Sequence, residues 1–442
     1  MNAFRRLQQF GQRLSGKKMV RNTLWMLLAR GLQIAIQSFY FVAITRTLGP
    51  TKYGGFMAIL ALVWTVVPFA SWGWPNILVR NVSRNPASFR QAWGNALLVT
   101  ACLGTVWVVA IVAIARWILP DSLPIVLVLY VAISQLLFDR LTTIAGRAFQ
   151  ALQRLKITAV LNTFLRMRNL VAALIFISLG QTDNLELWGQ IFCASAAVVT
   201  AIGLGLVHTQ LGAPALDLAA IRAEVLRGFY FSVGLSSQTI YNNIDKAMLA
   251  KLGTLSATGA YAAGYRLVEI AFTPVMAITA VAYAKFFQQG ESGIRGSLAL
   301  AARLLPIASG YSAIVSLVLL FGAPLVPFIL GEDYAGVVNV VRWLAVIPLL
   351  RTLHFFAADT LTGAGFQGMR TAMQVGIAIF NAGLNLWWIP LFSWRGAIGS
   401  SLASDALLAI GLWMLVRMLA RQEAATGEPA DPLQDKVEAG IS

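Results

Sequence analysis

Basic side chains recur inside the long apolar segments of this sequence, where charged groups are rare. Six of them are Arg30, Arg166, Arg168, Lys246, Arg266 and Arg351. An ionised side chain at the centre of a bilayer costs about 2.5–3.5 kcal/mol on insertion scales, so it usually faces a wet cavity or a partner. Guanidinium groups match the oxygens of phosphate and pyrophosphate in bidentate geometry. Arg168 and Arg351 have no acidic partner nearby in the sequence, so we expect them to be unpaired. The six residues therefore predict a basic cavity for a phosphate-bearing ligand. For Arg30 and Arg166, snorkelling to the membrane surface is the alternative interpretation.

Uncharged polar side chains share helix faces with these cations. Arg30, Gln33 and Gln37 are spaced so that they lie on one face of a helix. The same holds for Asn162, Arg166 and Asn169. As residues that could contact sugars we take Gln33, Gln37, Asn162, Asn169, Asn243, Asn381 and Asn385. The alternative is that these amides only form hydrogen bonds between neighbouring helices.

Four acidic residues within the apolar segments could carry protons or bind sodium during transport. They are Asp245, Glu269, Asp359 and Asp405. Buried carboxylates in membrane segments often serve this purpose. The alternative is structural pairing, for which Lys246 adjoins Asp245 and Arg266 lies one helical turn from Glu269.

No catalytic or metal-binding pattern is convincing. The two histidines, His208 and His354, are far apart and have no metal-ligand spacing around them. Residues 11–18 approach a phosphate-binding loop, but Lys18 replaces the Ser or Thr that would hold magnesium. Residues 363–368 match G-x-G-x-x-G, yet they join two apolar segments and are better explained as a turn. We therefore expect no metal, no cofactor and no enzymatic activity.

The composition indicates the elements that must position these residues. The 442-residue chain is 58% hydrophobic and 12% charged, whereas soluble domains carry about 25% charged residues. Apolar runs of about 20 residues predict an all-α polytopic membrane protein. The net charge of +16 is dispersed between these runs, which fits the positive-inside rule better than a nucleic-acid partner.

Twelve transmembrane helices are expected, in two six-helix lobes around a central cavity. The predicted spans are approximately 22–44, 54–74, 92–116, 123–145, 157–180, 187–208, 227–251, 258–282, 298–322, 336–361, 371–391 and 396–419. Gly49 and Gly55 recur in the second half as Gly253 and Gly259 with the same spacing. This repetition suggests two related halves.

The domain boundaries follow from these spans and from the charges. They are a basic amphipathic segment at 1–20, an N-lobe at 21–208, a linker at 209–226, a C-lobe at 227–420 and a disordered tail at 421–442. The basic segment suits an anionic lipid surface, and a disordered tail is its alternative. Lys and Arg are concentrated in the loops that share a side with the N-terminus, so both termini and the linker are expected in the cytoplasm.

Several short motifs, in order along the chain, resemble those of a known family. They are Asn22-Thr-Leu-Trp25 through Thr47-Leu-Gly-Pro50, Tyr53-Gly54, Asp245-Lys-Ala-Met-Leu249, Leu330-Gly-Glu-Asp-Tyr334 and Gly396-Ala-Ile-Gly. In these residues the chain resembles the Wzx-type oligosaccharide flippases of the multidrug/oligosaccharidyl-lipid/polysaccharide exporter superfamily. The resemblance implies a flippase that moves polyprenyl-pyrophosphate-linked oligosaccharides across the bacterial inner membrane by alternating access.

The resemblance also implies partners and a pathway. The partners would be an undecaprenyl-pyrophosphate-linked glycan, anionic lipids, and the polymerase and chain-length machinery of a surface polysaccharide such as O-antigen, exopolysaccharide or capsule. A cation-coupled drug antiporter of the same superfamily is one alternative, but it would place carboxylates rather than cations in the cavity. A membrane-bound glycan polymerase or ligase is another, but such enzymes usually need a large outer loop, and the predicted outer loops are short.

Overall fold

The computed structural model describes the backbone of residues 2–426. It describes the side chains of residues 31–426, except those at 155, 226–227, 230–231, 233–235, 237–238 and 284. The side chains of the predicted basic segment at 1–20, the side chain of Arg30 and the tail beyond 426 therefore lie outside the described part. Within that part the secondary structure is entirely helical.

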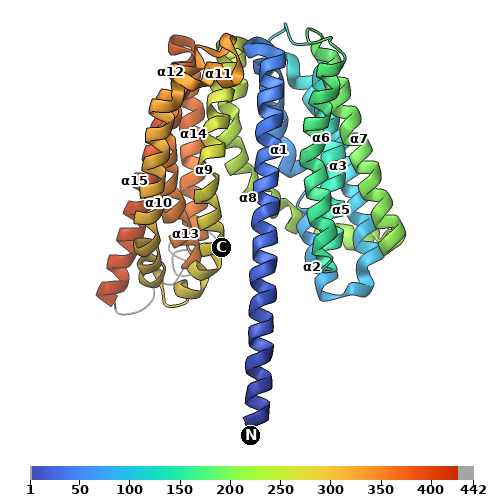
Figure 1. The fold of residues 1–442 in the computed structure, drawn as a ribbon, viewed down its shortest axis with the longest axis vertical. Helices are drawn as coiled ribbons and strands as arrows, with labels where there is room; N and C mark the ends of the chain where they lie inside the picture. The colour runs from blue at the N-terminus through green and yellow to red at the C-terminus, as the bar shows by residue number, and fades with distance from the viewer. Residues whose placement is uncertain (1, 427–442) are drawn as a thin grey trace.

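The first half of the chain forms the N-lobe and the second half the C-lobe (Figure 1). The N-lobe contains α1 (Asn2–Ala70), α2 (Trp74–Arg84), α3 (Phe89–Ile118), α4 (Ile125–Ala132), α5 (Asp139–Ala151), α6 (Leu155–Ser178) and α7 (Leu185–Leu211). The C-lobe contains α8 (Leu218–Leu252), α9 (Leu255–Gly290), α10 (Ile294–Gly322), α11 (Val326–Leu330), α12 (Val337–Leu344), α13 (Ile347–Gly363), α14 (Gln367–Phe392) and α15 (Trp394–Thr426). A π-helix, Ile133–Phe138, joins α4 to α5, and short 3-10 turns lie at Pro86–Ser88, Ala323–Leu325 and Glu332–Tyr334.

The expectation of twelve transmembrane helices is confirmed. Ten helical segments of the described residues are long and apolar enough to cross a membrane. The first of these, Gly31–Arg84, contains two spans because α1 is broken at Gly49, which has φ +65°. The 35-residue helix α8 completes the set. Pro50 then starts the second part of α1, a position where its fixed φ and missing N–H are tolerated.

The connection between the lobes is shorter than the predicted linker at 209–226. Helix α7 continues to Leu211 and α8 begins at Leu218. Asp217 explains the early start of α8, because its side chain accepts a hydrogen bond from the backbone N–H of Ala220 at 3.0 Å and so caps the helix. At the other end of the C-lobe, α15 continues to Thr426, past the expected start of the tail at 421.

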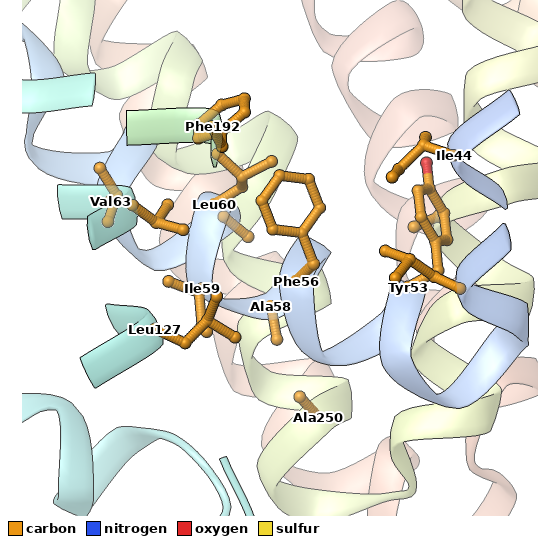
Figure 2. Close-up of a cluster of buried hydrophobic side chains, with 14 of the residues drawn as sticks. Ile44, Tyr53, Phe56, Ala58, Ile59, Leu60, Val63, Leu127, Phe192 and Ala250 are labelled. Atoms are coloured by element: carbon orange, nitrogen blue, oxygen red, sulfur yellow. The ribbon is translucent and has the colours of Figure 1, made fainter. Parts of the chain in front are cut away.

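The two lobes converge at the end of the molecule that carries the turn at Gly49, which we call the Gly49 end (Figure 1). In Figure 2, Ile44 and Tyr53, from the two sides of this turn, lie beside each other. They belong to one buried cluster that also contains Phe56, Phe192 and, from the C-lobe, Ala250. The rings of Phe56 and Phe192 are 5.4 Å apart, centroid to centroid, at nearly a right angle, a favourable aromatic arrangement. The apolar core therefore joins both lobes at this end.

Two glycines let the lobes cross in direct backbone contact at the Gly49 end. A Cβ atom at Gly54 would overlap the carbonyl oxygen of Leu255, and one at Gly259 would overlap the carbonyl oxygen of Pro50. The contact is reciprocal, since each glycine faces the first turn of the other lobe's helix. The predicted repeat of glycines thus has a physical role: only glycine permits this approach of α1 to α9.

We predict that Gly54→Ala and Gly259→Ala each destabilise the protein by about 1–3 kcal/mol, because a methyl group would have to push two backbones apart. The measurement is thermal unfolding of the purified variants in detergent. Gly310→Ala on α10 is the matched control, since a Cβ there meets nothing within 4 Å. Equal stability of all three variants and the wild type would contradict a tight crossing at Gly54 and Gly259.

Candidate functional site

A cavity of about 950 Å³ lies between the two lobes. Its N-lobe wall comes from α1, the π-helix, α5, α6 and Phe192 of α7. Its C-lobe wall comes from Lys246 at the end of α8 and from one face of α9. The size is within the range of ligand-binding pockets. The cavity is therefore the natural site for a ligand that both lobes contact.

Positive charge dominates the cavity. Five basic and two acidic residues line it: Arg140, Arg166, Arg168, Lys246, Arg266, Asp139 and Glu269. Two ion pairs account for both acids, Arg168 with Asp139 and Arg266 with Glu269. The remaining positive charge favours an anionic ligand, because charges interact more strongly where water is limited.

Most of the residues predicted for the site meet in this cavity. Those that line it are Gln33, Gln37, Asn162, Asn169, Arg166, Arg168, Lys246, Arg266 and Glu269. Those that do not are Asn243, Asn381, Asn385, Arg351, Asp245, Asp359 and Asp405. The placement agrees with the helix-face argument for α1 and α6, whereas α13, α14 and α15 contribute nothing to the described lining.

A chain of polar side chains organises the N-lobe wall. Arg168 is 3% exposed, and its Nη2 donates to both carboxylate oxygens of Asp139, at 2.6 and 2.7 Å. Gln135 Nε2 also donates to Asp139, at 2.7 Å, and Trp64 Nε1 donates to Gln135 at 2.9 Å. The expectation that Arg168 lacks a partner is therefore wrong. Asp139 lies 29 residues away, so no helical spacing connects the two in the sequence.

The π-helix explains why Gln135 and Asp139 were missed. It inserts extra residues into the turn before α5, and such π-bulges often occur at functional sites. Arg140 was missed for the same reason. It lines the cavity, and its Nε is buried with no hydrogen-bond partner among the described residues.

The C-lobe wall contacts the N-lobe through Arg266. Its Nη1 lies 3.0 Å from Glu269 Oε2, and its Nη2 donates to Oε1 of Gln37 on α1 at 2.8 Å. The expected pair of Arg266 with Glu269 is thus present. Lys246 Nζ lies 2.7 Å from the carbonyl oxygen of Asn242 and 3.8 Å from Asp245, so the expected partial neutralisation by Asp245 is also present.

The residues outside the cavity form a buried polar layer inside the C-lobe. Arg351 Nε lies 3.6 Å from Asp405 Oδ2, so the expectation that Arg351 is unpaired is wrong. Asn385 donates to Asn381, and Asn381 donates to Ser404 on α15, at 2.9 and 3.1 Å. These amides join α14 to α15, as the alternative interpretation had it. Asp359 is likewise buried within α13.

The chain resembles the structure of a multidrug resistance MATE family transporter of the MOP superfamily in an inward-facing conformation, with TM-score 0.74, 14% identity, and 89% of this chain and 96% of that chain covered. The outward-facing form of such a transporter gives TM-score 0.59 at 15% identity, covering 88% and 94%. The lipid II flippase MurJ, in an inward closed conformation, gives TM-score 0.73 at 10% identity, covering 89% and 87%.

These similarities define the fold of the chain: it is the helical membrane fold that MATE transporters and MurJ share. The family model for polysaccharide biosynthesis proteins matches residues 19–288, which is more than half of the chain. The chain therefore belongs to the polysaccharide biosynthesis protein family. No curated protein matches the sequence.

We predict that Asp139→Ala lowers the free energy of unfolding by about 3–5 kcal/mol, because it leaves the buried guanidinium of Arg168 without a counter-charge. Chemical unfolding in detergent measures the change. The double variant Asp139→Leu with Arg168→Met should recover most of the loss, since it removes both charges. Asp183→Ala, which breaks the exposed pair with Lys52, is the control and should leave stability unchanged. Equal effects of Asp139→Ala and Asp183→Ala would contradict the role of this pair.

Proposed function

We propose that the protein is a flippase that carries polyprenyl-pyrophosphate-linked oligosaccharides across the bacterial inner membrane for the synthesis of a surface polysaccharide. The observation that carries the proposal is the excess of basic residues in a cavity between two lobes of a polysaccharide biosynthesis family member. The similarity to a lipid II flippase supports it. An undecaprenyl-pyrophosphate-linked glycan is the proposed substrate, and the polymerase and chain-length machinery of the pathway are proposed partners.

The pyrophosphate would bind among the basic residues of the lining, which outnumber the acidic residues five to two. Besides Arg168 and Arg266, three further basic residues line the cavity: Arg140, Arg166 and Lys246. Two of these three belong to the N-lobe and one to the C-lobe, so a doubly charged ligand would be held by both lobes. Charge-assisted hydrogen bonds of this kind are the stronger ones.

The glycan would occupy the polar part of the same cavity. Gln33, Gln37, Asn162 and Asn169 offer amide donors and acceptors to sugar hydroxyls. Tyr40, Trp64 and Tyr265 add aromatic surface to the lining. The polyprenyl chain would stay in the surrounding lipid, because its transfer into a polar cavity is unfavourable.

Alternating access would use the Gly49 end as a gate. The lobes contact each other there through Gly54 and Gly259, and Arg46 of α1 donates to the carbonyl of Ile329 at 2.7 Å. With both termini in the cytoplasm, as the charge distribution predicts, the Gly49 end faces outward. The described conformation would then receive substrate from the cytoplasmic side and release it after the Gly49 end opens.

A multidrug antiporter is the second function to weigh, because the fold is shared with MATE transporters. Cationic drugs require unpaired carboxylates in the binding site. Both acids of this cavity are already in ion pairs with arginines. The charge of the cavity therefore favours an anionic lipid-linked substrate over a cationic drug.

We predict that deletion of the gene causes lipid-linked oligosaccharide to accumulate and one surface polysaccharide to disappear. Mass spectrometry of extracted lipids and analysis of the surface glycan measure both effects. In the complemented strain, Arg140→Gln and Lys246→Gln should lower export about 10-fold to 100-fold, since each removes a charged hydrogen bond worth about 1.5–3 kcal/mol. Arg303→Gln, at an exposed position on α10, should restore export fully.

Other outcomes would redirect the assignment. Normal surface glycan together with greater sensitivity to cationic dyes would favour a drug antiporter. Full activity of Arg140→Gln and Lys246→Gln in a strain that needs the protein would show that the cavity does not bind the pyrophosphate.

A further inference from the structure

A second cluster of ionisable groups lies inside the C-lobe, beside the cavity and not in its lining. Asp405 of α15 is 1% exposed at its side chain and is surrounded by three groups. Tyr241 of α8 donates a hydrogen bond to its Oδ1. His354 Nε2 lies 3.4 Å from the same oxygen, and Arg351 Nε lies 3.6 Å from Oδ2. Side chains from α8 and α13 thus surround one buried carboxylate of α15.

This cluster lacks hydrogen bonds that its groups could make. Among the described residues, neither Nδ1 nor Nε2 of His354 has a hydrogen-bond partner, and Oδ2 of Asp405 has none. Buried polar atoms are normally paired, and each exception calls for an explanation. His354 Nε2 faces Asp405 Oδ1 at 3.4 Å, so a proton on this nitrogen points at a carboxylate that can accept a hydrogen bond from it. The imidazole therefore already lies beside the carboxylate that would accept this hydrogen bond.

The cluster is connected to the cavity through one aromatic ring. The guanidinium carbon of Arg351 lies 5.4 Å from the centre of the Tyr265 ring, and Lys246 Nζ lies 5.2 Å from the same centre. Tyr265 and Lys246 both line the cavity. The guanidinium of Arg351 therefore lies between the carboxylate of Asp405 and the ring of Tyr265, which forms part of the cavity wall. It is 14% exposed at its side chain, so it is not sealed in the protein.

The charged and titratable groups around His354 come from several helices. Arg351 lies on its own helix, Asp405 on α15 and Tyr241 on α8, while α9 contributes Tyr265 and Glu269. Helix α10 faces α13 with Ser312, which shares a hydrogen bond with Thr352. Its basic residues are Arg295 and Arg303. Helix α14 carries Arg370, which donates to Thr362 further along α13. Asp405 is the acidic group nearest to His354 among these.

We propose that His354 and Asp405 form a proton-binding site whose occupation strengthens anion binding in the cavity. With neutral His354, the positive Arg351 and negative Asp405 balance each other. A proton added to the ring nitrogen gives the cluster a net positive charge. The imidazolium then competes with Arg351 for Asp405, and Arg351 becomes available to an anion beside Tyr265. This inference rests on the proposed function, because it takes the anion to be the pyrophosphate of the lipid-linked glycan.

The linkage has a direction. Because binding linkage is reciprocal, an anion in the cavity must raise the proton affinity of His354 by the factor by which the proton raises anion affinity. Proton and substrate therefore bind together. In an antiporter of cationic drugs the two would compete for a carboxylate. The site thus makes substrate loading favourable at low pH and does not by itself exchange protons for substrate.

The test is calorimetric titration of the purified full-length protein with geranyl-pyrophosphoryl-N-acetylglucosamine, a pyrophosphate diester whose charge stays constant near neutral pH. Wild-type protein should bind the probe on the order of tenfold more tightly at about pH 6 than at about pH 8. Titration in buffers of different ionisation enthalpy should show proton uptake on binding. His354→Gln should bind with the same affinity at both pH values and without proton uptake.

The chain offers a matched control, because it contains only two histidines. His208→Gln, at an exposed position on α7, should keep the pH dependence and the proton uptake. If His354→Gln does not fold, the imidazole resonances of isotopically labelled wild-type protein provide a second measurement. The two signals are assigned with His208→Gln, and addition of the probe should raise the titration midpoint of His354 only.

The outcomes separate this inference from the proposed function. Equal affinity of the wild-type protein at both pH values, or a pH dependence that persists in His354→Gln, would overturn the proton site and leave the flippase assignment standing. Absence of probe binding to the wild-type protein at either pH would overturn both.

Discussion

The cost of placing charge in a low-dielectric interior governs this structure. A guanidinium or carboxylate among apolar helices is tolerated only when it is paired or hydrated. The protein meets this constraint in two ways. Asp139 and Asp405 pair with arginines inside their own lobes, and five basic residues lie around a cavity that can hold water or a ligand. The cavity lies at the interface between the lobes, because both lobes contribute residues to its lining.

Both lobes place an ion pair beyond a break in their fourth span. In the N-lobe the π-helix interrupts the span, and Asp139 follows it directly. In the C-lobe the span is interrupted between Leu344 and Ile347, and Arg351 follows in α13. The charges are reversed, with an acid in the first lobe and a base in the second. The two halves therefore share a backbone plan but place opposite charges after the break.

Features that depend on local pattern could be predicted from the sequence, and features that depend on distant pairing could not. The helices, the turn at Gly49 and the polar faces of α1 and α6 follow from apolar run length and from the spacing of Gln33, Gln37 and Asn162. The partner of Arg168 could not be found, because Asp139 is brought to it by a π-helix that has no clear signature in sequence. Arg351 looked unpaired because its partner, Asp405, lies on another helix. Spacing within one helix does not report what the neighbouring helix supplies.

A flipping assay with the purified protein in liposomes tests whether the cavity carries lipid-linked glycans. A fluorescent polyprenyl-pyrophosphate-linked sugar is incorporated in both leaflets, and a membrane-impermeant quencher reports how much of it can reach the outer leaflet. We predict that nearly all the fluorescence is quenched in vesicles that contain wild-type protein. About half should be quenched in vesicles that contain no protein or the Arg140→Gln, Lys246→Gln double variant. Quenching of only about half of the fluorescence with well-folded wild-type protein, across the range of pH, would contradict the central claim that this cavity carries lipid-linked glycans across the membrane.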